Sequence, residues 1–151
     1  MLRFLFTLLA ASTLAAAAHA HQYSVARLVI GHPWSRPTAS GVPTGVAYLS
    51  ITNNGPQQDT LIAASTPAAA RVEFHRSSLE AGMARMRPAG AVVVAPNTTI
   101  TAEPGGLHLM LVDLKSPLVA GTSVPLVLQF ESAGSITVQL QVEPQGPAAH
   151  H

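Results

Sequence analysis

The chain has 151 residues, no cysteine, and a formal net charge of +1 at pH 7. The lack of cysteine excludes disulfides, thiolate zinc sites and thiol chemistry. Acidic and basic side chains are nearly balanced, so the basic stripe that phosphate neutralisation requires is missing, and we expect no nucleic-acid partner.

The first twenty residues, Met1–Ala20, have the pattern of a secretory signal peptide. A basic start is followed by an apolar run and by Ala18-His19-Ala20, which matches the A-x-A cleavage pattern. We expect cleavage between Ala20 and His21 and export to the periplasm. The alternative is a membrane anchor, but the apolar run is short for a spanning helix and no basic cluster follows it. A lipid anchor would need a cysteine at the cleavage site.

The rest of the chain is predicted to be one all-β domain over residues 21–143, followed by a flexible tail, 144–151, rich in Pro, Gly and Ala. Short runs rich in Val, Ile, Leu and Thr recur between Gly, Pro and Asn turn signals, a pattern typical of a β-sandwich or barrel. The predicted strands are Val25–Ile30, Val46–Thr52, Thr60–Ala64, Arg71–Phe74, Ala91–Val94, Thr99–Thr101, Leu107–Val112, Val124–Phe130 and Ser135–Val142.

Two histidines and two methionines stand out as soft metal ligands. His108 and Met110 lie two apart on one predicted strand, so both side chains point to the same face, while the leucines between and beside them face the other way. A strand with leucine on one face and His and Met on the other is unusual for a surface. His75 ends another predicted strand, and Met86 lies in a segment too polar for the core. Imidazole and thioether donors together suit monovalent copper.

Several stretches resemble the periplasmic PCu(A)C copper chaperones over nearly the whole chain after the leader. They include His75-(ten residues)-Met86-(twenty-one residues)-His108-x-Met110, together with His32-Pro33-Trp34-Ser35-Arg36, Gly45-Val46-Ala47-Tyr48-Leu49, Ala70–His75, Met86-Arg87-Pro88, Pro104–Met110 and Val124-Pro125-Leu126.

The resemblance implies a cupredoxin-like Greek-key β-sandwich or barrel without enzymatic activity. It implies that His75, Met86, His108 and Met110 hold Cu(I). It also implies delivery of that copper to an acceptor, a cytochrome c oxidase subunit or its assembly factor.

Two departures from the family pattern concern additional metal donors. Many relatives carry a methionine shortly after the first histidine, whereas Arg76, Ser77 and Ser78 follow His75 here, and Met83 does not occupy that place. Some relatives also have a long His- and Met-rich tail that binds divalent copper. This chain offers only His150 and His151, so a Cu(II) site there would be secondary and weak.

Two alternative functions follow from the residues. After cleavage, the α-amine and imidazole of His21 could chelate Cu(II), as in copper redox enzymes that use an N-terminal histidine. Such a site needs another histidine against His21, and the resemblance does not place one there. His32, before Pro33, is expected to be structural. The second alternative is a purely structural β-sandwich. No triad, phosphate loop or carboxylate pair indicates hydrolase or nucleotide chemistry.

Overall fold

The computed structural model describes residues 21–144, and this part of the chain is entirely β-strand, turn and loop. The predicted leader, 1–20, and all but the first residue of the predicted tail lie outside the described residues. Within 21–144, no helix is long and apolar enough to cross a membrane. The all-β prediction is confirmed. The strands are β1 Gln22–Val25, β2 Leu28–Ser35, β3 Thr44–Asn53, β4 Asp59–Ser65, β5 Ala69–Glu80, β6 Met83–Pro88, β7 Val92–Val94, β8 Thr98–Ala102, β9 Leu107–Leu114, β10 Ser123–Phe130 and β11 Gly134–Val142.

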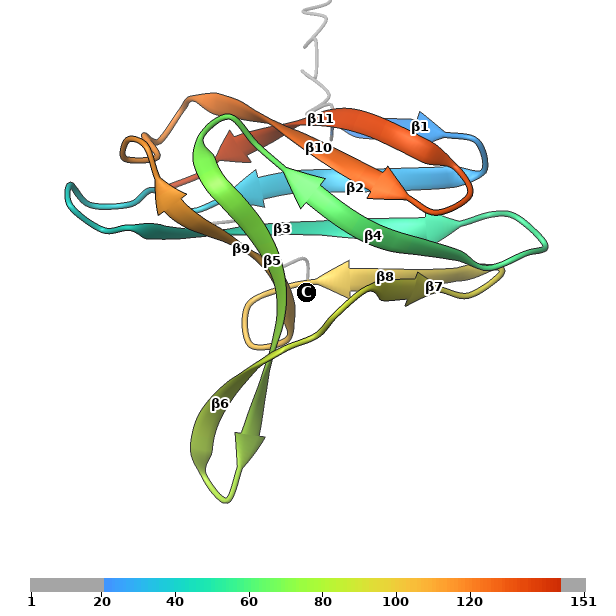
Figure 1. Cartoon of the computed structure of the whole chain (residues 1–151), viewed down its shortest axis with the longest axis horizontal. Helices are drawn as coiled ribbons and strands as arrows, with labels where there is room; N and C mark the ends of the chain where they lie inside the picture. Colours follow the sequence, from blue (N-terminus) through green and yellow to red (C-terminus); the bar gives the residue numbers. More distant parts are fainter. Residues whose placement is uncertain (1–20, 145–151) are drawn as a thin grey trace, which may run out of the picture.

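One mixed sheet follows the order β6-β5-β9-β3-β2-β11-β10-β4-β7, with β1 added to β2 and β8 to β3. Strands β11 and β2 run parallel, and the other pairs are antiparallel. Neighbours such as β3 and β9 are far apart in sequence, as in Greek-key connections. The sheet bends over, so strands from both halves of this order face each other (Figure 1).

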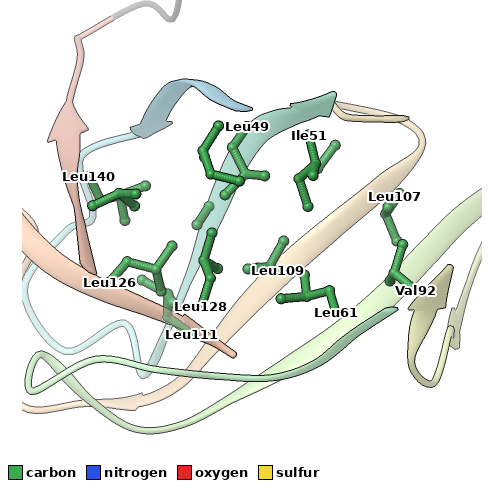
Figure 2. Close-up of a cluster of buried hydrophobic side chains, with 14 of the residues drawn as sticks. Leu49, Ile51, Leu61, Val92, Leu107, Leu109, Leu111, Leu126, Leu128 and Leu140 are labelled. Atoms are coloured by element: carbon green, nitrogen blue, oxygen red, sulfur yellow. The ribbon is translucent and has the colours of Figure 1, made fainter. Parts of the chain in front are cut away.

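The core lies between these facing strands. Leu49 and Ile51 of β3 and Leu109 of β9 lie across from Leu126 and Leu128 of β10, and all five side chains are almost fully buried (Figure 2). Alternation along each strand sends every second residue into this core. The residues between them are left on the outer face of the sheet, where a site can form.

Two parts of the strand prediction were wrong. The stretch predicted as Val25–Ile30 is a hairpin, in which β1 and β2 are joined at Ala26-Arg27 and Ala26 has a φ of 51°. The strand predicted to end at Phe74 continues to Glu80 and pairs with β6, which was not predicted. The extension and β6 are largely exposed and polar on both faces, so they lack the alternation that signals a half-buried strand.

A tight turn holds the β5–β6 hairpin together. Ala81 and Gly82 both have positive φ, 51° and 79°, which is the geometry of a type I′ turn. The hairpin projects from the body of the molecule (Figure 1). It forms the edge of the sheet at β6 and carries one of the predicted copper ligands.

Candidate metal centre

The four predicted ligands lie on three adjacent strands at this edge, β6-β5-β9. His75 and His108 are directly opposite each other in the β5–β9 ladder, and Met110 is opposite Glu73. Met86 is opposite Ser77 in the β5–β6 ladder, which makes it a diagonal neighbour of His75. Directly opposite residues point to the same face, as do residues two apart on one strand. The register therefore assigns all four ligands to one face.

The opposite face of β9 belongs to the core, as the sequence predicted. Leu107, Leu109 and Leu111 are buried in the hydrophobic cluster. His108 is also buried, with 4% of its surface exposed, and Met110 is half-buried. These two predicted ligands are therefore set into the surface of the sheet.

The two imidazole rings lie close together, with their centroids 6.0 Å apart. His75 Nδ1 and His108 Nε2 are both buried, and neither has a hydrogen-bond partner among residues 21–144. A buried polar atom without a partner is costly in free energy, and it is common where a metal ion or ligand binds. Each of these nitrogens is well suited to donate its lone pair to a metal.

The second nitrogen of each ring is already engaged. His108 Nδ1 lies 3.0 Å from the carbonyl oxygen of Gly106, and His75 Nε2 lies 2.9 Å from Glu73 Oε2. Both oxygens only accept, Glu73 being ionised, so each of these ring nitrogens must carry the proton and donate it. Such contacts fix the tautomer and orient metal-binding histidines. They leave Nδ1 of His75 and Nε2 of His108 as the free donors.

Glu73 is the supporting residue that the sequence did not single out. Its carboxylate accepts from Arg71 Nε at 2.7 Å as well as from His75, and Arg71 also contacts Asp113 at 2.8 Å. The hydrogen bond from Arg71, and then the one from His75, lower the pKa of Glu73 below its ordinary value of 4.5. The carboxylate thus stays ionised and keeps its contact with His75. Its position two residues before His75, on the same strand face, was a signal that could have identified it.

Met86 is the most accessible of the four ligands, with 52% of its surface exposed on edge strand β6. Diagonal neighbours across an antiparallel pair, such as Met86 and His75, are typically about 7–8 Å apart with their Cβ atoms somewhat closer, which leaves room for a metal between the side chains. Met83 is similarly exposed, at 56%. It lies three residues away on the same strand and therefore faces the opposite side of the hairpin.

An aromatic pair on strands β2 and β3 lies on the same face of the sheet as the predicted ligands. Trp34 and Tyr48 are directly opposite each other, both are buried, and their ring centroids are 4.6 Å apart. Burial raises the pKa of Tyr48 above its ordinary value of 10.0. In the β3–β9 register Val46 pairs with Met110, so Tyr48 lies on the same face as the ligands. Trp34 is a packing residue on this outer face, outside the central core.

Comparison with known proteins places the chain in a family. Residues 28–142 match the family model described as "LpqE-like: Putative lipoprotein LpqE-like". The chain is 27% identical over 115 residues to "Putative lipoprotein Lxx21020" of Leifsonia xyli subsp. xyli, covering 76% of this chain and 68% of that protein. It is 24% identical over 119 residues to "Uncharacterized protein RP573" of Rickettsia prowazekii, covering 76% of this chain and 66% of that protein.

Solved structures agree with this assignment. A structure described as "Copper-bound PCuAC domain from PmoF2" superposes with a TM-score of 0.72 and 30% identity, covering 82% of this chain and 98% of that one. The Cu(I) form of DR1885 from Deinococcus radiodurans gives a TM-score of 0.60 and 27% identity, covering 87% and 85%. The cupredoxin-like fold predicted from the resemblance is confirmed. The chain therefore belongs to the LpqE-like/PCuAC family.

Proposed function

We propose that this chain binds monovalent copper and carries it to an acceptor outside the cytoplasm. The donors are His75 Nδ1, His108 Nε2 and the thioethers of Met86 and Met110. The observation that carries the proposal is the pair of buried, unpartnered imidazole nitrogens on facing residues, with both methionines on the same face. Two nitrogens and two thioethers suit Cu(I), which is soft and accepts low coordination numbers.

Export rests on the leader Met1–Ala20, which has a secretory pattern. The lipoprotein descriptions of the family model and of the Leifsonia relative support a location outside the cytoplasm. For the acceptor we propose the copper centres of cytochrome c oxidase or one of its assembly factors, as the family resemblance implies.

Ligand exchange, and no catalysed reaction, is the proposed mechanism of transfer. The histidines are fixed in the sheet by Glu73 and Gly106, whereas Met86 sits on an exposed edge strand. An acceptor ligand can therefore replace Met86 first while the imidazoles still hold the ion. Thiolate sulfur binds Cu(I) more tightly than thioether sulfur, so an acceptor with cysteines takes the metal downhill in free energy. The ionised Glu73 is tied to Arg71 and His75 and is a poor proton donor.

The experiment compares three single substitutions by anaerobic competition with a chromophoric Cu(I) chelator. We expect Met86→Leu and Met110→Leu each to weaken Cu(I) binding at least about tenfold, since each removes a ligand and not only an outer partner. Met83→Leu is the matched control, because Met83 is equally exposed on the same strand but faces away. Unchanged affinity in both ligand variants would refute the proposed site.

Transfer to an acceptor is tested separately. The Cu(I)-loaded protein is mixed with the metal-free copper domain of an oxidase subunit under reducing conditions, the proteins are separated, and copper is measured in each. We expect copper to move to the domain with cysteines. If the metal stays with the chain, the delivery part of the proposal is wrong even where the site itself is correct.

A further inference from the structure

The backbones of a second pair of histidines, His21 and His32, are joined next to the β1–β2 hairpin, on other strands than the four predicted ligands. Gln22 is opposite Gly31 in this ladder, and the N–H of His32 donates to the carbonyl oxygen of His21 at 3.2 Å. His21 and His32 are thus neighbours across the two strands. The sequence did not indicate this pairing, because the stretch 25–30 was predicted as one strand and the hairpin that brings the backbones of residues 21 and 32 together was not foreseen.

The backbone of His32 is held in an unusual conformation. Its φ is 43°, in the left-handed region, and the β2–β3 register is irregular between Gly31 and Trp34. A residue before proline normally adopts an extended conformation, and a non-glycine residue rarely has positive φ. Strained backbone of this kind is found disproportionately at functional sites. Here the residue with the strained backbone is a histidine whose side chain is 42% exposed, so packing in the core does not require it.

A carboxylate lies against the side chain of His32. His32 Nε2 lies 3.0 Å from Glu143 Oε1, at the end of β11, where the Glu143 N–H donates to the Ser35 carbonyl at 2.9 Å. Despite this short distance, the geometry is not that of a hydrogen bond, and Nε2 is a buried atom without a hydrogen-bond partner among the described residues. Two donors bound to one metal at a right angle, each about 2.0 Å from it, are separated by about 2.8 Å. The spacing of Nε2 and Oε1 is close to that value.

We propose that the mature protein binds one divalent copper ion at its N-terminus. The donors are the α-amine and imidazole of His21 and the imidazole of His32, with the Glu143 carboxylate as an oxygen donor. This inference rests on the proposed export, because the α-amine is free only after cleavage following Ala20. Three nitrogens and one oxygen suit the tetragonal coordination of Cu(II). The thioether-rich site suits Cu(I), so the two sites bind different oxidation states of the same metal.

The experiment uses protein purified from the periplasm, with its N-terminus established by mass spectrometry. Copper(II) is titrated in and followed by electron paramagnetic resonance and by quenching of Trp34, the single tryptophan, which lies two residues from His32. We expect one Cu(II) per chain with a nitrogen-rich axial spectrum. Insertion of one glycine before His21, or His32→Gln, is expected to abolish this signal. Glu143→Gln should weaken Cu(II) binding at least about tenfold, because it replaces an anionic oxygen donor to the metal with a neutral amide.

Controls separate this site from the Cu(I) site. Met86→Leu with Met110→Leu should lose Cu(I) and keep the Cu(II) spectrum, whereas the glycine insertion should keep Cu(I) affinity and the far-ultraviolet circular dichroism of the folded sheet. Several results would overturn the inference. They are a mature N-terminus other than His21, an unchanged Cu(II) spectrum after the insertion, loss of that spectrum in the methionine variant, or displacement of Cu(II) by equimolar Zn(II).

Discussion

At the scale of single residues, the site depends on which nitrogen of each histidine is free. Glu73 and the Gly106 carbonyl each accept a hydrogen bond from one ring nitrogen and leave the other nitrogen buried and without a partner among the described residues. The proposed donor atoms therefore differ between the rings, Nδ1 in His75 and Nε2 in His108. A supporting carboxylate is expected to contribute to metal affinity without touching the metal.

Replacement of Glu73 tests this orienting role. Glu73→Ala removes the acceptor for His75 Nε2, and we expect Cu(I) affinity to fall by about 10–100-fold. Glu73→Gln should recover part of the loss, because the amide oxygen can still accept a hydrogen bond. Chelator competition measures both variants. Glu80→Ala is the matched control on the same strand, since Glu80 contacts Arg85 and Arg87 and not the histidines. Equal losses in the Glu73→Ala and Glu80→Ala variants would contradict an orienting role.

The lowered pKa of Glu73 also predicts how stability depends on pH. A carboxyl group with a lowered pKa in the folded state stabilises that state fully above its ordinary value, here 4.5, and loses this contribution as the pH falls through the lower folded value. The metal-free protein should therefore be more resistant to urea than Glu73→Gln at pH 7, and the difference should shrink below pH 4.5. The effect is small because the side chain is 40% exposed. A difference that grows in acid would contradict the assignment.

At the scale of elements, the β5–β6 hairpin carries the proposed ligand Met86 at the exposed edge of the sheet. Its strands are not held by core packing, because β6 is exposed along its whole length. The turn and the ladder hydrogen bonds hold it instead. Local opening of such an edge hairpin costs less free energy than opening of the core strands. We expect this difference to help release copper through Met86.

Ala81 provides a way to change the hairpin alone. Its positive φ of 51° is unfavourable for alanine, whereas Asn followed by Gly82 is the preferred sequence of a type I′ turn. Ala81→Asn should relieve about 1 kcal/mol of strain and slow amide exchange in β6. Copper transfer should slow with it. Ala84→Asn, on the strand instead of the turn, is the control and should not slow exchange. Faster exchange in the Ala81 variant would show that the turn is not under strain.

At the scale of the whole molecule, the features that the sequence could predict are mainly those of strands that pack one face against the core. The face shared by His108 and Met110 followed from alternation alone, because leucines on the other face of β9 are buried. The pairing of His75 with His108 did not follow from pattern, since β5 and β9 lie far apart in sequence and only the fold sets their register.

The elements that were missed share a physical cause. Strand β6 and the end of β5 bury almost nothing, so no hydrophobic period marks them. The β1–β2 turn at Ala26-Arg27 has no glycine, and the residues on either side read as one apolar run. The prediction of Met86 depended mainly on the family spacing, and His32 could not be considered as a ligand until the hairpin was known. The hydrophobic pattern of a sequence indicates which residues are buried. Both proposed sites depend instead on which strands pair with each other, and the pattern does not show that pairing.

The most direct test of the central claim is X-ray absorption at the copper edge of the exported protein loaded anaerobically with one equivalent of Cu(I). The four proposed donors predict a first shell of sulfur and nitrogen together, with sulfur lost when Met86 and Met110 are both replaced by leucine and retained when Met83 is replaced. A shell of nitrogen and oxygen alone in the unaltered protein would contradict the claim.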